Sequence, residues 1–158
     1  MKRKYDYRRT LPHLQKDSRP VFVSFNAFRR WTLPGDARDI ALNCCLFPNR
    51  KMAGIHVAVV MPEHVHLVLT PLQDGNEGPF SLPEITQSIK SVSAHRINRL
   101  LKRSGPVWLE ESFDHVLRSS ESLAEKVEYV RQNPVRRGLC KAPEEYRWLW
   151  VNPERFDW

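Results

Sequence analysis

The stretch GIHVAVVMPEHVHLVLTPL, residues 54–72, constrains the fold of this chain more than any other segment. It contains two valine-rich apolar runs on either side of residues 61–63, and this pattern predicts a β-hairpin. Hydrophobicity this continuous indicates a central strand that is covered on both faces. In the second arm His64, His66 and Val68 point to one face of the sheet, because side chains alternate along a strand. The chain therefore requires a layered fold.

A strand and a short helix are expected before this hairpin. The segment RPVFVSFNAF, residues 19–28, is β-branched and aromatic with alternating apolar positions, which predicts a first strand. Turn residues follow, with Asp36 as a candidate N-cap, and the spaced apolar residues after it predict a short helix that ends before Pro48. Residues 107–118, VWLEESFDHVLR, resemble a further strand or extended segment.

A long helix is predicted from Ser81 to the stop signal Gly105. Ser81 and Glu84 have the spacing of a capping box, and glycine is a common residue after a helix. Its apolar stripe is expected to comprise Ile85, Ile89, Val92, Ile97 and Leu100.

A second helix is predicted over SLAEKVEYVRQNP, residues 122–134. Ser122 and Glu125 have the spacing of another capping box, and Leu123 belongs to the expected apolar stripe. Pro134 should end this helix, because a residue before proline avoids the α region.

The order β–α–β–β–α–β–α predicts an α+β domain with a mostly antiparallel sheet and helices on its faces. A length of 158 residues suits one domain. Residues 1–18 are expected to form a basic N-terminal arm, and residues 141–158 an aromatic tail that packs back over the domain. No apolar run approaches 18 residues, so no membrane association is expected. Three cysteines without a CxxC spacing indicate reduced thiols and a cytoplasmic protein.

The charge favours a phosphate-bearing partner. The net charge is +7 and the pI is about 9.6, and lysines and arginines that neutralise phosphates drive binding by releasing counterions. The polar face of the first long helix, with Lys90, His95 and Arg96, could hold a nucleic-acid backbone. A solvated basic surface is the alternative.

Two residue pairs could support chemistry. His64 and His66 would project two imidazoles from one strand face, as two ligands of a divalent ion or as hydrogen-bonded core histidines. Tyr129 and Asn133 lie four residues apart and so share a helix face. Tyrosine can be a nucleophile and asparagine an oxygen ligand, although for this helix viewed in isolation a packed tyrosine and an ordinary helix end are the favoured interpretation.

Four stretches in order resemble the single-tyrosine HUH transposases, and most closely the REP-associated tyrosine transposases. They are MPEHVHLVLTP, ITQSIKSVSAHRIN, GPVWLEESFDHVLR and VEYVRQNPVRRGL, and the likeness extends over roughly residues 19–150. The resemblance implies one ferredoxin-like HUH domain over residues 1–158. It implies Tyr129 as the nucleophile and Mg²⁺ or Mn²⁺ held by His64, His66 and Asn133. Glu63 stands where asparagine is usual and could be an outer-shell carboxylate or merely cap the turn.

The resemblance also implies a partner and an activity. The partner would be single-stranded or hairpin DNA of the REP type, contacted by basic side chains: Arg8, Arg9, Lys90, His95, Arg96, Arg131 and Arg136. The activity would be a metal-dependent nickase and strand-transferase, or transposase, that forms a 5′-phosphotyrosine. Such a protein would act in the cytoplasm, associated with the nucleoid, as a monomer or homodimer. A DNA-binding protein of the same fold that does not cut, and a metal-dependent hydrolase of another phosphate ester, are the alternatives.

Overall fold

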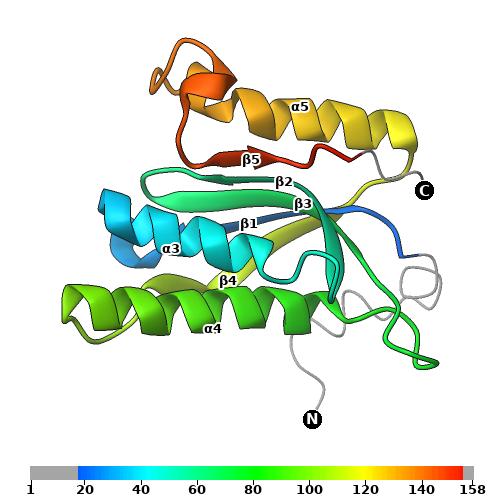
Figure 1. The fold of residues 1–158 in the computed structure, drawn as a ribbon, viewed down its shortest axis with the longest axis horizontal. Helices are drawn as coiled ribbons and strands as arrows, with labels where there is room; N and C mark the ends of the chain where they lie inside the picture. Colours follow the sequence, from blue (N-terminus) through cyan, green and yellow to red (C-terminus); the bar gives the residue numbers. More distant parts are fainter. Residues whose placement is uncertain (1–17, 155–158) are drawn as a thin grey trace.

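The computed structural model describes residues 18–154, which form a five-stranded antiparallel sheet with helices on both faces (Figure 1). The strand order is β4-β1-β3-β2-β5. The strands are β1 (Val21–Ala27), β2 (Ala53–Val60), β3 (His64–Pro71), β4 (Trp108–Val116) and β5 (Leu149–Val151).

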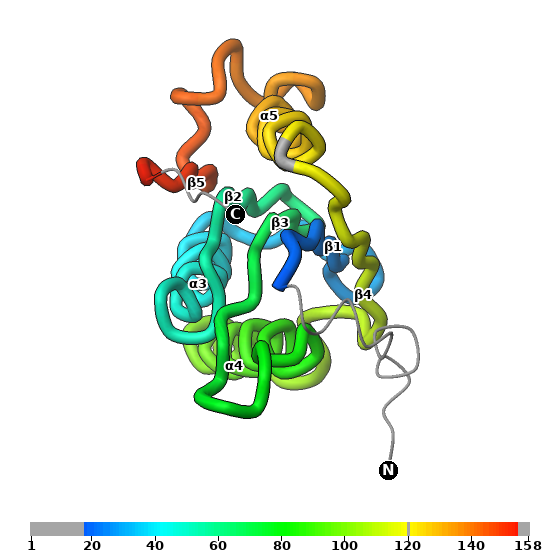
Figure 2. Tube along the Cα trace, turned by 90° about the vertical axis from the view of Figure 1, so that its right-hand side faces the viewer, coloured from blue at the N-terminus to red at the C-terminus, as the bar shows by residue number. Residues whose placement is uncertain are grey.

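Three α-helices cover this sheet. Helices α3 (Gly35–Leu46) and α4 (Leu82–Leu101) lie on one face, and α5 (Ser120–Arg136) lies on the other (Figures 1 and 2). Two short 3₁₀ turns, η1 (Phe28–Arg30) and η2 (Pro143–Glu145), follow β1 and precede β5. The order β1-α3-β2-β3-α4-β4 with a 4-1-3-2 sheet is the ferredoxin-like arrangement, which confirms the predicted α+β class. In the described part of the chain, no helix is both long and apolar enough to cross a membrane.

The predicted hairpin is confirmed as β2 and β3 at the centre of the sheet. Every residue of β2 is buried, because β3 and β5 flank it and helices cover both of its faces. Two apolar clusters result, one between the sheet and the α3–α4 layer and one beneath α5. The register pairs His66 with Ser24 of β1 and with Val59 of β2. Both histidines of β3 therefore lie on the face that α5 covers.

Helix α4 begins as predicted, but it ends earlier and buries a different set of side chains against the sheet. The Ser81–Glu84 capping box is present, whereas the helix ends at Leu101 instead of continuing to Gly105. Val92 and Leu100 of the expected apolar stripe are exposed. Polar residues take buried positions instead: Ser93 is buried and its hydroxyl accepts a hydrogen bond from the Trp108 indole at 2.9 Å.

Helix α5 differs from the prediction at both ends. The Ser119 side chain caps its start by accepting from the Ser122 N–H, so the predicted Ser122–Glu125 capping box is wrong. The helix continues through Pro134 to Arg136. A proline in the last turn removes one hydrogen-bond donor, and the Arg137 N–H still donates to the Asn133 carbonyl at 3.0 Å. Asn133 therefore remains within the helix, one turn after Tyr129.

The C-terminal segment contributes an edge strand. The sequence did not predict this strand, because the segment has no regular apolar pattern. Strand β5 pairs with β2, and Trp150 lies opposite Ala58. Tyr146 anchors this segment, because its buried hydroxyl donates to the Val60 carbonyl at 2.7 Å. The expectation that the tail packs back over the domain is confirmed up to residue 154.

Candidate functional site

The paired histidines of β3 lie next to each other on the sheet face beneath α5. The ring centroids of His64 and His66 are 4.5 Å apart, with the planes at 72°. Burial lowers the pKa of both imidazoles. Neutral imidazole is the form that can coordinate a cation.

Glu63 fixes the orientation of the first histidine. Its Oε1 lies 3.0 Å from His64 Nδ1 and also accepts from Arg137 Nη1 at 2.9 Å. Burial raises the pKa of Glu63, but hydrogen bonds from Arg137 and His64 outweigh it and lower the pKa overall. An ionised Glu63 makes Nδ1 the protonated nitrogen of His64. Its Nε2 then has a free lone pair, as in the carboxylate–histidine pairs of metal sites.

His66 has an unpaired nitrogen in the protein interior. Its Nδ1 is buried and has no hydrogen-bond partner. Burial and the positive charges of Arg136 and Lys126 lower its pKa to about 3. The imidazole is therefore neutral at physiological pH, and the neighbouring cations favour this neutral form.

A second buried side chain with an unpaired polar atom is Asn133 of α5. It is 7% exposed, and its Nδ2 makes no hydrogen bond. Because a 180° rotation of the amide exchanges nitrogen and oxygen, the same place can hold Oδ1. Asn133 lies one turn after Tyr129 and one turn before Arg137, so all three share one face of α5.

These atoms fit a divalent cation better than a closed hydrogen-bond network. Unpaired buried polar atoms cost free energy, and a cation would use the lone pairs of two imidazoles and one amide oxygen. Among the described residues, no group of three or more His, Cys, Asp or Glu side chains could hold a metal. A cation held by the two histidines would therefore need ligands of another kind, such as an amide oxygen or oxygens from outside the chain.

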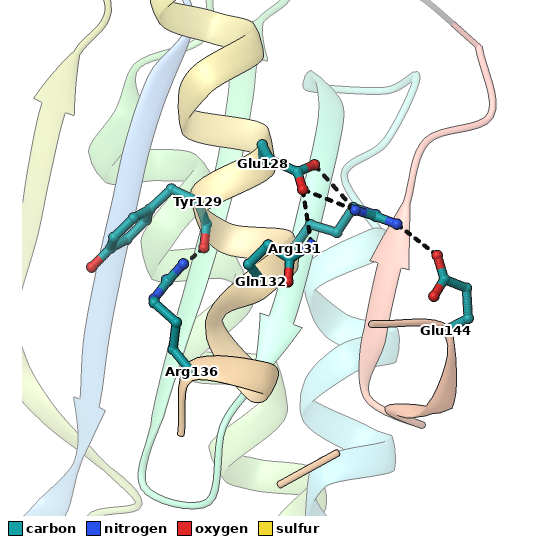
Figure 3. Close-up of polar contacts among 6 residues, drawn as sticks. All are labelled: Glu128, Tyr129, Arg131, Gln132, Arg136 and Glu144. Carbon is teal, nitrogen blue, oxygen red and sulfur yellow. Dashed lines mark hydrogen bonds and ion pairs between the residues drawn. The ribbon is translucent and has the colours of Figure 1, made fainter. Parts of the chain in front are cut away.

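Phe22 of β1 connects Tyr129 to the histidine pair, because its ring contacts both Tyr129 and His66. The Tyr129 ring meets the Phe22 ring edge-on at 6.4 Å, and Phe22 stacks on His66 at 5.4 Å. Tyr129 is 47% exposed, whereas Phe22 is buried. The phenol is therefore accessible to a ligand from outside the chain. Figure 3 shows Tyr129 extending from α5 over β1.

Cationic side chains flank the tyrosine on its own helix. Lys126 Nζ is 4.9 Å from the Tyr129 ring centroid, and the Arg136 guanidinium is 4.2 Å from it. Arg136 also donates to the Tyr129 carbonyl at 2.6 Å (Figure 3). Lys126, Arg137 and Phe22 were missed by the sequence reasoning. The spacing of Lys126, three residues before Tyr129, could have identified it, whereas no sequence pattern links Phe22 or Arg137 to the histidines.

Other predicted DNA contacts lie away from this site. Arg131 points to the opposite side of α5 and pairs with Glu128 at 2.9 Å and with Glu144 at 2.6 Å (Figure 3). His95 and Arg96 are exposed, but α4 lies on the other face of the sheet. Arg8 and Arg9 lie outside the described residues.

The structure contradicts the prediction that Lys90 contacts DNA, because the Lys90 side chain is buried. Lys90 is 8% exposed, and its Nζ donates to the carbonyls of Leu109 and Glu110 at 2.6 and 2.8 Å. It also donates to Ser112 Oγ at 3.1 Å. Burial lowers its pKa to about 8. All three donors of the ammonium group are used within the fold, so Lys90 holds α4 against β4 instead of facing a ligand.

Comparisons with known proteins found a relative in sequence and similar solved structures. A Haemophilus influenzae protein named "Putative REP-associated tyrosine transposase" is 24% identical over 92 residues, which are 55% of this chain and 52% of that protein. The chain thus matches about half the length of this curated relative. No family model matches the chain.

A solved structure of a REP-associated tyrosine transposase bound to a REP hairpin has the same fold. The two superpose with a TM-score of 0.68 over 84% of this chain and 76% of the other, at 21% identity. The chain therefore resembles REP-associated tyrosine transposases in both sequence and fold, as its four sequence stretches predict.

Proposed function

We propose that this chain, which shares its fold with a REP-associated tyrosine transposase, is a metal-dependent nickase and strand-transferase for single-stranded hairpin DNA. The observation that supports this most is the convergence of Tyr129 and His66 on the Phe22 ring. A half-exposed phenol beside two neutral imidazoles and several cations suits attack on a phosphodiester. Genomic DNA as the substrate would place the protein in the cytoplasm with the nucleoid.

The substrate phosphate would lie between Tyr129 and the histidine pair. Lys126 and Arg136 flank the phenol and would attract the DNA backbone. His64, His66 and Asn133 would hold Mg²⁺ or Mn²⁺. When bound, the ion would neutralise the non-bridging oxygens of the phosphate, which otherwise repel a nucleophile.

The transfer step follows from the chemistry of tyrosine. Tyr129 Oη would attack the phosphorus, a new O–P bond would form, and the bond from phosphorus to the 3′-oxygen would break. The 3′-oxygen leaves as a hydroxyl after it takes up a proton, and the phenol proton is released to solvent. The 5′ end remains on Tyr129 as a phosphotyrosine. Attack by a 3′-hydroxyl reverses the step and joins strands without an external energy source.

The proposal is tested with a 5′- and 3′-labelled hairpin oligonucleotide that carries an unpaired flank, incubated with Mn²⁺. Wild-type protein should form a covalent adduct that contains the 3′ portion of the DNA, and Tyr129→Phe should form none while it still binds the hairpin. Chelation should abolish the adduct, and added Mn²⁺ should restore it. Mass spectrometry of the adduct should locate it on the peptide with Tyr129.

Tyr146→Phe is the matched control, because the Tyr146 hydroxyl is buried against the Val60 carbonyl and cannot reach a phosphate. Its adduct should persist. Tight hairpin binding by the wild type with no adduct under Mg²⁺ or Mn²⁺ would instead support a DNA-binding protein that does not cut. An adduct on another residue would show that Tyr129 is not the nucleophile.

A further inference from the structure

Part of the sheet face that carries the paired histidines is open to solvent. On this face α5 packs against β2 and β3, whereas β1 and β4 continue beyond it. Exposure rises along β1 on this side, because Phe22 is 6% exposed, Ser24 is partly buried and Asn26 is exposed. The residues of β1 that point to the opposite face are all buried. This open part of the sheet therefore presents side chains to a ligand.

Strand register places these side chains beside the histidines. Ser24 lies opposite His66 on one side and opposite Phe113 of β4 on the other, and Asn26 lies opposite His64. Directly opposed side chains on neighbouring strands are about 5 Å apart at Cβ. Phe113 is two strand spacings, or about 10 Å, from His66, a distance that one nucleotide can span. We call Ser24, Asn26 and Phe113 the β1–β4 patch.

Phe113 provides the patch with an exposed aromatic ring. The side chain is 62% exposed, and its ring meets the buried Phe22 ring edge-on at 6.2 Å and 65°. Lys126 lies over the rings of Phe22 and Tyr129, but no cation among the described residues lies over Phe113. Exposed aromatic rings of this kind are where proteins stack the bases of single strands.

Asn26 provides the patch with hydrogen-bonding groups that the fold does not use. Its side chain is exposed and forms no hydrogen bond within residues 18–154. The register between β1 and β4 shifts between Phe25 and Ala27, so no residue of β4 is paired with Asn26. An amide has two donors and an acceptor, and it can bind a base edge through two hydrogen bonds at once.

The β1–β4 patch suits a base better than a phosphate. Its three side chains are a hydroxyl, an amide and a phenyl ring, and none of them carries a charge. The cations Lys126 and Arg136 lie instead at Tyr129, which extends over β1 (Figure 3). A nucleotide bound here would have its phosphate at the cations and its base on the neutral patch, where base identity can be read.

We propose that the β1–β4 patch binds the unpaired base next to the phosphate that Tyr129 attacks, and that Asn26 selects the identity of this base. The base stacks on Phe113, and its edge is hydrogen-bonded by the Asn26 amide. Asn26 is thus a specificity-determining residue. This inference rests on the proposed function for the position of the cut, but base preference is also measured by binding alone.

The test uses a hairpin with a randomised unpaired flank. Strands that the protein retains without metal are sequenced, and so are the fragments on both sides of the cut after reaction with Mn²⁺. Wild-type protein should favour one base at one flank position by roughly 5- to 150-fold, which is the discrimination of one bidentate contact. Asn26→Ala should lose this preference, and an unchanged melting temperature would verify its fold.

Asn26→Asp and Asn43→Ala complete the set of variants. Aspartate keeps the size and the acceptors of Asn26 but has no donor when ionised, so Asn26→Asp should shift the preference toward cytosine or adenine, whose amino groups donate. A variant that merely disturbed the fold would not change the preferred base in this way. Asn43 is exposed on α3, which covers the opposite face of the sheet, and Asn43→Ala should keep the wild-type preference (Figure 1).

Three results would overturn the inference. The first is a wild-type protein without a base preference, and the second is an Asn26→Ala variant that keeps the wild-type preference. The third is a raised Mn²⁺ requirement or an equal loss of affinity for all flanks in Asn26→Ala with the preference unchanged, because Asn26 would then act on the ion or a phosphate. Base-selective binding that depends on Asn26 but yields no adduct would contradict only the proposed function.

Discussion

Glu63 Oε1 accepts a hydrogen bond from Arg137 Nη1 at 2.9 Å, and this contact ties the loop before the paired histidines to the end of the helix that carries Tyr129. The same oxygen lies 3.0 Å from His64 Nδ1. The Glu63 carboxylate therefore orients both His64, a candidate metal ligand, and α5, the helix that carries the candidate nucleophile Tyr129.

Glu63→Ala should weaken the response to metal more than it weakens DNA binding. Without the carboxylate, His64 loses the partner of its Nδ1, and loss of such a partner commonly reduces metal affinity about 10- to 100-fold. Titration of adduct formation with Mn²⁺ measures the change, and Glu63→Gln, which can still accept a hydrogen bond, should retain most of the affinity. Glu144→Ala serves as the control, because Glu144 pairs with Arg131 away from the histidines. An unchanged Mn²⁺ requirement in Glu63→Ala would refute this role.

Arg136→Ala should slow adduct formation at saturating DNA by roughly tenfold. The variant loses a charged hydrogen bond to the Tyr129 carbonyl and a guanidinium 4.2 Å from the ring, which together hold the phenol in place. Arg131→Ala removes the same residue type from the opposite side of α5 and should react at the wild-type rate (Figure 3). Single-turnover kinetics of adduct formation distinguish the two variants. Equal rates for both would show that the Arg136 contact does not position Tyr129.

Phe113→Ala should reduce affinity for an unpaired oligonucleotide by roughly 5- to 100-fold, which corresponds to about 1–3 kcal/mol for one stacked base. Phe113 is 62% exposed, and its ring lies 6.2 Å from that of Phe22, next to the candidate site. Phe47 is 61% exposed but lies at the end of α3, so Phe47→Ala should bind as the wild type does. Fluorescence anisotropy of a labelled strand gives both affinities. Identical affinities of the two variants would exclude base stacking on Phe113.

The free energy of unfolding should fall as the pH falls from about 6.5 to 4, partly because of His56. Burial lowers the pKa of His56 from 6.5 to about 4, so in this interval the unfolded chain takes up a proton that the folded protein does not. The contribution of neutral His56 to the free energy of unfolding is fully present above pH 6.5. At most roughly 3 kcal/mol of it is lost by about pH 4. Urea unfolding at several pH values should show a smaller pH dependence in His56→Gln. The remaining dependence should include His64 and His66, whose pKa values are also lowered. An identical pH dependence in His56→Gln would contradict this account.

Local patterns predicted the elements whose signals lie close together in the sequence. The hairpin follows from alternating and continuous apolar residues over 54–72, and the start of α4 follows from the Ser81–Glu84 spacing, which forms a capping box in the structure. The shared face of His64 and His66 also follows from the two-residue period of a strand. Where a local signal competed with packing, as at Pro134, the prediction was wrong, because a last helical turn tolerates one missing donor.

The sequence by itself therefore determined the α+β class, the histidine pair and the tyrosine–asparagine spacing, since their signals lie within single elements and in the order of those elements along the chain. Only the tertiary structure decided which distant residues meet them. It turned Lys90 inward onto β4, brought Arg137 to Glu63 and placed Phe22 between Tyr129 and His66. Such contacts depend on strand register and on the rotation of each helix over the sheet, which are fixed by burial of the whole core and leave no periodic signal in the chain.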